Sequence, residues 1–208
     1  MGQTPHQSAW GGGPRVTTDE VARRAAQLFE TGKARSLPAA IRLATEQLHA
    51  SDTPKPGHGR VRKHAQAMML QSLGDVGYAE LQRHVWDVAE QLMTTLMHAL
   101  PDVECDMTGR AAKGQIDCGA VIRVRAYTRR SIEEIAAVLV EYDYEEPKFE
   151  APSTKYGKLS RIRFFEEGEE VTLTRVPPTL RHAARTDLFK GEPVHVVTVD
   201  DLRAKLAS

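Results

Sequence analysis

The first half of the chain carries apolar residues at the three-to-four-residue spacing of amphipathic helices. Residues 17–20 read Thr-Thr-Asp-Glu, a capping box, and Gly32 is the expected stop of the helix that follows. Ser36 is the expected cap of a second helix, whose Pro38 falls in the first turn, where its missing N–H costs nothing. We therefore expect a short helical pair.

Two longer helices are expected next, after a break at residues 51–57 that contains two prolines and a glycine. The third runs from about Gly59 to Leu73, with Gly74 as its terminating residue. Apolar positions cover more than half the circumference of the fourth, residues 78–100. Such a helix must pack on several sides, so we expect it to join the two halves of the chain.

After Pro101 the apolar period changes from 3.6 to 2, which indicates strands. Residues 103–107 and 120–127 are the first two expected strands, and a capping box at Ser131 opens a helix that should cover the sheet. The acidic stretch 166–170 separates two further strands, as a hairpin loop would. A short strand at 194–197 and a helix capped by Thr198 end the pattern.

The expected fold class is therefore α+β, with about four helices followed by a small β-β-α-β-β sheet and a C-terminal helix. The expected division is a disordered leader at residues 1–15, a helical region at 16–100 and a sheet domain at 101–208. The leader is rich in glycine and poor in apolar residues, which cannot offset the entropy lost on ordering.

Composition excludes several classes of function. Lys and Arg total 28, as do Asp and Glu, so no net charge draws the whole chain to a polyanion. Cys105 and Cys118 have no partner at metal-ligand spacing, and we expect no metal site. No apolar run is long enough to span a membrane, and nothing resembles a secretory signal. We expect a cytoplasmic protein with no membrane partner.

Local charge is less even, and one expected strand carries a basic face. Arg123 and Arg125 alternate with Ile122 and Val124, which predicts one buried and one basic side. Lys158, Arg161 and Arg163 would extend this basic face if their strand pairs nearby. Guanidinium groups at such spacing suit phosphates, although an ordinary solvated face neutralised by the Glu-rich segment 131–150 would look the same.

A second basic cluster, residues 58–64, falls at the expected start of the third helix, where free backbone N–H groups favour an anion. Ordinary helix surfaces also carry such clusters, and the chain lacks a Gly-rich phosphate loop. The full set of expected phosphate or nucleic-acid contacts is Arg60, Arg62, Lys63, Arg110, Lys113, Arg123, Arg125, Arg129, Arg130, Arg161 and Arg163.

A glycine-punctuated crossing at residues 108–119 joins the first two expected strands. A helical pair, a long helix, a strand ending at Gly109, a strand after Asp117, a helix and a hairpin follow one another in the order of poorly characterised bacterial proteins described as nucleotidyltransferase-like. The turn Gly191-Glu192-Pro193 before the last helix is also similar. The chain resembles this family in layout over most of its length.

The resemblance implies a fold relative without an intact catalytic centre. In active nucleotidyltransferases a Gly-Ser turn precedes two metal-binding carboxylates on one strand, and a neighbouring strand supplies a third. Here Arg110 stands in place of the Ser, Gly119 in place of the second acid, and residues 171–176 contain no carboxylate. Asp117 is the one catalytic or metal-ligand candidate, and as a turn residue it needs no such role.

These patterns favour a non-catalytic protein that binds a phosphate-bearing ligand, nucleotide or nucleic acid, and needs no cofactor. Three alternatives stay open. An active nucleotidyltransferase would use Mg²⁺ held by carboxylates such as Asp106 and Asp117. A protein–protein adaptor would use the acidic segment 133–150. A helix-turn-helix at residues 19–49 would bind DNA, although Arg42 is the sole cation inside its second helix.

Overall fold

The computed structural model describes residues 15–144 and 147–208, so the expected leader lies outside the described residues apart from Arg15. The chain forms two compact units, divided between Met68 and Met69. The division falls inside the long helix, whereas the sequence pattern assigned that whole helix to the helical region.

The first unit is helical. α1 (Thr18–Glu30) begins with the predicted capping box, because Thr17 accepts from the Glu20 backbone and Glu20 accepts from the Thr17 backbone. α2 (Leu37–Gln47) begins at the predicted Ser36 cap with proline in its first turn. Both helices pack through a core of alanine, valine, leucine and isoleucine that Val61 and Ala65 complete from the following helix.

That following helix, α3 (His58–Ala99), combines the two long helices expected from the sequence. Gly74 interrupts it with φ 68° and ψ 175°, a conformation that a side chain with Cβ rarely adopts. The prediction that a helix ends at Gly74 is confirmed in its backbone angles, but the chain restarts at once instead of forming a loop. Residues after Met68 pack in the second unit.

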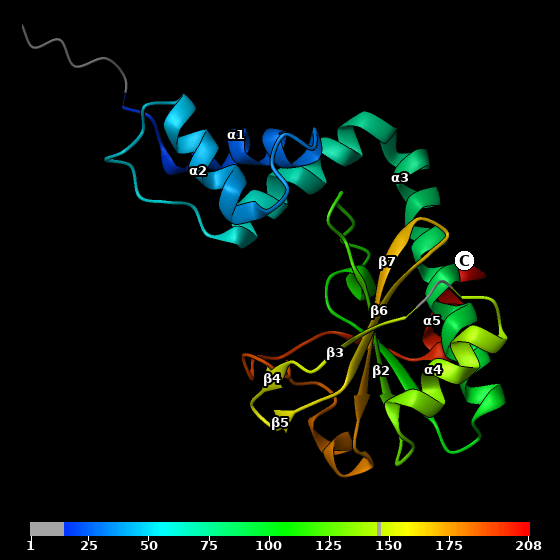
Figure 1. Ribbon diagram of the computed structural model, residues 1–208. Helices are drawn as coiled ribbons and strands as arrows, with labels where there is room; N and C mark the ends of the chain where they lie inside the picture. The colour runs from blue at the N-terminus through cyan, green and yellow to red at the C-terminus, as the bar shows by residue number, and fades with distance from the viewer. Residues whose placement is uncertain (1–14, 145–146) are drawn as a thin grey trace, which may run out of the picture. The chain divides into compact units, whose positions relative to one another are not determined.

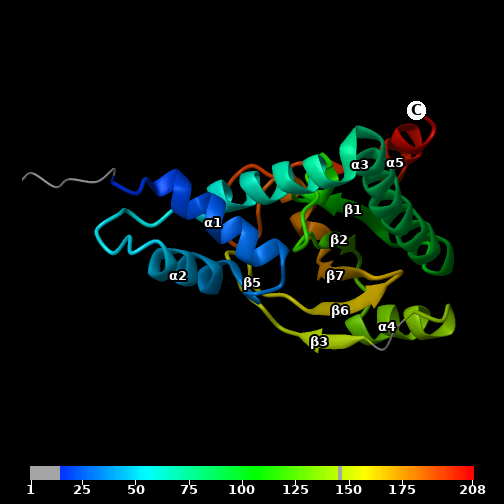
Figure 2. The ribbon, with the colours of Figure 1, turned by 90° about the horizontal axis from the view of Figure 1, so that it is seen from above.

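The second unit is an α+β domain built on a six-stranded sheet of order β3-β6-β7-β2-β1-β8, seen across its width in Figure 2. Its strands are β1 (Glu104–Thr108), β2 (Ile122–Tyr127), β3 (Lys148–Glu150), β6 (Arg161–Glu166), β7 (Glu169–Val176) and β8 (Val196–Val197). β2 and β7 are parallel, and the other neighbours are antiparallel.

Helices cover the apolar face of this sheet. Figure 1 shows α4 (Ile132–Glu141), α5 (Val199–Leu206) and the second half of α3 on that face. Met107, Val124, Leu173 and Ile162 occupy neighbouring register positions across four strands, and all are fully or almost fully buried. This row and the helices above it form the main hydrophobic core.

Several strand predictions need correction in detail. The hairpin between β6 and β7 turns at Glu167 and Gly168, both with positive φ, so its loop is two residues and not the whole acidic stretch. Neither β3 nor the small hairpin of β4 (Ser153–Thr154) and β5 (Gly157–Lys158) was expected. These strands are only two or three residues long, too short for a clear period of two.

The opposite face of the sheet carries an irregular cover, residues 177–195, which we call the strap. It contains the 3₁₀ helix η2 (Pro178–Ala183) and lies on the side away from α4 and α5 in Figure 1. The strap is fixed at several points: Lys155 N–H donates to Leu188 O (2.9 Å), and Gly109 N–H donates to His195 O (3.2 Å). Thr186 and Pro193 form a β-bridge within it.

No helix in the described part of the chain is long and apolar enough to cross a membrane.

Candidate phosphate-binding pocket

The sheet face beneath the strap carries two rows of polar side chains. The first, which we call the open row, aligns Thr108, Arg123, Thr172 and Arg163 across β1, β2, β7 and β6. The second, the covered row, aligns Asp106, Arg125, Thr174 and Arg161 on the same strands. The alternation read from β2 is therefore confirmed, and β7 contributes a threonine to each row.

Arg125 belongs to the covered row and is not the exposed residue that the alternation predicts. It is only 5% exposed. Its guanidinium donates to the carbonyl oxygens of Ala184 (2.8 Å) and Thr186 (3.0 Å) in the strap. The prediction that this side chain faces solvent is wrong, because strand alternation decides which face a residue occupies and not what covers that face.

Between the strap and the sheet lies a pocket of about 480 Å³. Four cations line it, opposed by the strap carboxylates Asp187 and Glu192. Thr108, Thr172 and Thr174 also line this space, and Phe189 adds a half-exposed aromatic ring. The four cations are Arg123, Arg125, Arg161 and Lys190.

Arg123 is the cation of the open row that lines this pocket from an exposed position. Its side chain extends beside Gly109, where an added Cβ would lie 3.5 Å from a terminal guanidinium nitrogen. Gly109 has φ 88°, which favours glycine and lets the backbone turn out of β1 at the pocket rim. The Arg123 guanidinium therefore lies beside the Gly109 backbone at the rim of the pocket.

The arginines of β6 are held by carboxylates from neighbouring strands. Arg161 donates through Nε to Glu150 (2.8 Å) and forms a second contact with the same carboxylate. Arg163 pairs with Glu150 (2.8 Å) and Glu170 (3.4 Å) and does not line the pocket. Glu150 belongs to the acidic segment 131–150, but it lies in β3 and not in the helix that was expected to neutralise this face, and Glu170 of β7 adds a second carboxylate. Lys158 lies in the separate β4–β5 sheet and does not extend either row.

The two carboxylates considered for metal binding are each engaged by an arginine. Asp117, whose side chain is fully buried, accepts from Arg110 (2.8 Å) and from the Gly119 backbone (3.1 Å). Asp106, whose side chain is 1% exposed, is paired with Arg181 of the strap. In the described residues no three His, Cys, Asp or Glu side chains are grouped so as to hold a metal ion. Such a donor set does not fit the two-metal site of a nucleotidyltransferase.

The remaining predicted residues lie elsewhere. Lys113 lies in the 3₁₀ helix η1 (Ala111–Lys113) of the crossing and, like Arg110, does not line the pocket. Arg129 and Arg130 follow β2 at its other end, and Arg130 pairs with Asp102 (2.5 Å) and Glu134 (3.3 Å). Its guanidinium is the main cause of the lowered pKa of the Asp102 carboxyl. The residues of the basic turn, Arg60, Arg62 and Lys63, belong to the first unit.

Sequence reasoning missed the pocket residues that the strap and β7 supply: Lys190, Phe189, Thr172 and Thr174. Asp187 was the available signal in the strap, since its carboxylate accepts from the backbones of Phe189 (2.9 Å) and Lys190 (2.7 Å) in an Asx turn. Thr172 and Thr174 entered the sequence analysis only through the statement that residues 171–176 contain no carboxylate, and no role in binding was predicted for them.

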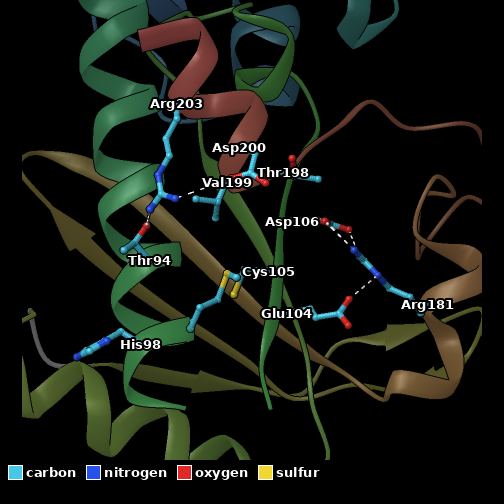
Figure 3. Close-up of a pocket in the computed structure, with 11 residues that line it drawn as sticks. Thr94, His98, Glu104, Cys105, Asp106, Arg181, Thr198, Val199, Asp200 and Arg203 are labelled. Carbon is cyan, nitrogen blue, oxygen red and sulfur yellow. Dashed lines mark hydrogen bonds and ion pairs between the residues drawn. The ribbon is translucent and has the colours of Figure 1, made fainter. Parts of the chain in front are cut away.

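A second cavity, of about 380 Å³, lies at the β1 edge of the sheet (Figure 3). Its charged groups face each other: Arg203 pairs with Glu90 (2.7 Å), and Arg181 pairs with Glu104 (3.1 Å). Cys105 lies at its centre, and burial raises the pKa of this thiol to about 12, so the reactive thiolate is scarce at neutral pH. Both arginines of the cavity are thus paired with carboxylates, and its thiol is not an activated nucleophile.

Comparison with known proteins gives low and partial likenesses. No family model matches the chain, and no curated protein sequence matches it. Among solved structures the chain is similar to a cytoplasmic RNA terminal U-transferase, with 13% identity and a TM-score of 0.35 over 47% of this chain and 35% of that one.

Two further structures are similar at the same level. The polymerase core of TRAMP, an RNA surveillance complex, matches with 12% identity and a TM-score of 0.36 over 42% of this chain and 29% of that one. The GLD-2/RNP-8 complex matches with 14% identity and a TM-score of 0.36 over 56% of this chain and 40% of that one. The chain thus matches less than half the length of each structure, and function is inferred from the pocket geometry alone.

Proposed function

We propose that this protein binds a phosphate-bearing ligand, a nucleotide or a segment of nucleic acid, in the pocket between the strap and the sheet, without catalysing a reaction on it. The observation that carries the proposal is the position of Arg123, exposed at the pocket wall, with Lys190 and three threonines lining the same space. Guanidinium and hydroxyl donors together are the groups that bind phosphate oxygens.

The rest of the pocket suits the remainder of such a ligand. Phe189 is 47% exposed and lines the pocket, so its ring is available to stack on a base. Asp187 and Glu192 lie on the strap side, where they can accept from hydroxyl or amino groups of a sugar or base. The phosphates would then face β2, and the base would face the strap.

Two observations support binding without catalysis. Metal-assisted nucleotidyl transfer requires carboxylates that hold the metal ions beside the phosphates. On the polar face β2 and β7 carry arginine and threonine at the four aligned positions, and Asp106 and Asp117 are each paired with a different arginine. The active nucleotidyltransferase would have to release both pairs before it could bind Mg²⁺.

A protein partner remains a second candidate, favoured by the surface near the acidic segment 133–150. Val140, Tyr142 and Phe149 are 60%, 46% and 55% exposed, an unusual set of large apolar side chains within ten residues. Glu145 and Glu146 of this segment lie outside the described residues. Replacing Phe149 by Ser should abolish capture of such a partner and leave phosphate binding unchanged.

The direct test is isothermal titration of the full chain with ATP and, separately, with inorganic pyrophosphate. We expect Arg123→Ala to weaken both by about tenfold, as removal of a charge-assisted hydrogen bond should. Arg163→Ala is the matched control, because Arg163 occupies the same row but does not line the pocket. Equal affinities for wild type and Arg123→Ala would overturn the proposal.

A further inference from the structure

Charge is divided unequally between the two units, and the zero net charge of the whole chain conceals the division. Residues 1–68 contain ten Lys and Arg against five Asp and Glu. Residues 69–208 contain eighteen Lys and Arg against twenty-three Asp and Glu. The small helical unit is therefore cationic at neutral pH, and the larger unit that contains the pocket is anionic.

Contacts within the helical unit leave its positive charge facing solvent. Asp19 accepts from His64 (2.9 Å) and pairs with Arg23 (3.4 Å), and the His64 hydrogen bond is the main cause of its lowered pKa. Glu20 is engaged in the α1 capping box. By contrast, five cations of this unit are exposed and form no ion pair with any residue that the structure describes: Lys33, Arg35, Lys55, Arg60 and Lys63.

The starts of α2 and α3 together form a groove of about 280 Å³. Lys55 lines this groove, and the other four cations are close in sequence to residues that line it. Arg42, Lys55 and His58 line the groove, and no carboxylate does. Arg35 precedes the first residue of α2 by two positions, and Arg60 and Lys63 lie in the first turns of α3. The basic residues thus gather around the place where two helices begin.

The helical unit also lacks the surface that a membrane or an apolar protein partner would use. All large hydrophobic side chains that are exposed in the described residues lie at position 70 or later. Membrane-surface helices bury an apolar face, and the cores of protein interfaces are enriched in aromatic residues. A surface with exposed cations and, among the described residues, no exposed large hydrophobic side chain suits the hydrated phosphodiester backbone instead.

We propose that residues 15–68 form a nucleic-acid-binding module that contacts the phosphodiester backbone through the cations around the α2–α3 groove. The contact does not depend on the nucleotide sequence. Arg42 is the only cation in α2, and it pairs with Glu46 at 4.0 Å. Reading bases in a groove needs several donors along one helix. This site does not depend on occupancy of the pocket beneath the strap.

The test uses the full chain and fluorescence anisotropy with a 20-base-pair duplex DNA and a single-stranded RNA of equal length, at several salt concentrations. We expect both to bind, with affinity falling steeply as salt rises. The double variant Lys55→Glu with Lys63→Glu should weaken binding by about tenfold or more. It should also lower the log–log salt slope by about one unit for each phosphate that is no longer neutralised.

Two controls separate this site from general charge and from the pocket. Arg83→Glu with Lys148→Glu makes the same change in net charge at exposed positions of the second unit, and should alter affinity by less than about threefold. The Lys55→Glu, Lys63→Glu variant should bind ATP as wild type does, because neither residue lines the pocket beneath the strap. The proposal is overturned if wild type shows no salt-dependent binding, if both double variants weaken it equally, or if phosphatidylserine vesicles bind as tightly as the oligonucleotides.

Discussion

The open and covered rows are built by the same strands, two residues apart, yet their arginines serve different purposes. Arg125 donates to two strap carbonyls and is buried, whereas Arg123 lines the pocket and is exposed. The difference comes from the strap, whose Ala184 and Thr186 carbonyl oxygens accept hydrogen bonds from the Arg125 guanidinium and cover it. A basic face on a strand therefore indicates a ligand site only when the segments that pack over that face are also known.

The largest expected effect is that of removing Arg125. Arg125→Ala should lower the free energy of unfolding by about 2–4 kcal/mol, because two strap carbonyl groups lose the charged donor supplied by this buried arginine and the strap loses an attachment. Urea denaturation measures this effect. A decrease below about 1 kcal/mol would mean that the covered row does not hold the strap, and that the contrast between the rows is wrong.

The carboxylate of the covered row should have the next largest effect. Asp106→Ala should cost about 1–3 kcal/mol, since the Arg181 guanidinium loses its buried partner but is 40% exposed and can be rehydrated. The same denaturation experiment applies. Addition of Mg²⁺ is the informative control: greater stability of wild type, but not of Asp106→Ala, with Mg²⁺ would favour the active nucleotidyltransferase.

A helix cap away from both rows provides a reference for these values. Ser131→Ala should cost about 1 kcal/mol, because the Ser131 hydroxyl accepts from the Glu134 backbone at the start of α4. The Ser131 backbone N–H also donates to Glu134 (2.8 Å), which is the main cause of the lowered pKa of that carboxyl. A thermal melt identical to that of wild type would contradict the assignment of the cap.

The smallest effect on stability is expected in the open row. Arg123→Ala should change the free energy of unfolding by less than about 0.5 kcal/mol, as is usual for an exposed position. If this variant unfolds as readily as Arg125→Ala, both arginines are structural, and the distinction between the two rows disappears.

Local sequence signals predicted most of the fold. The caps at Thr17, Ser36, Ser131 and Thr198 all begin helices, because their side chains satisfy backbone N–H groups within three residues. Gly74 breaks its helix as expected, because its left-handed φ suits glycine. The strands of four or more residues were found from their period of two.

Only part of the pocket could be predicted from the sequence. Arg123, Arg125 and Arg161 were expected as phosphate contacts, whereas the residues of β7 and the strap depend on long-range packing. The local sequence does not show which strand lies beside β2, because its parallel partner β7 is about fifty residues away in the chain. The burial of Arg125 depends on the strap, whose residues 184–195 form no helix and which is held by side-chain and backbone hydrogen bonds. The charge of the helical unit was concealed because the unit boundary lies within α3 and not in a loop.

The most direct test of the central claim is a pair of ATP titrations, of Arg123→Ala and of Arg163→Ala, with the unfolding free energy of each measured in parallel. Arg123→Ala should remain as stable as wild type within about 0.5 kcal/mol, and Arg163→Ala, which loses its ion pairs with Glu150 and Glu170, within about 1 kcal/mol. We expect Arg123→Ala to bind ATP about tenfold more weakly and Arg163→Ala to bind it as wild type does. Equal affinities in the two variants, whether both reduced or both unchanged, would contradict the pocket as the binding site.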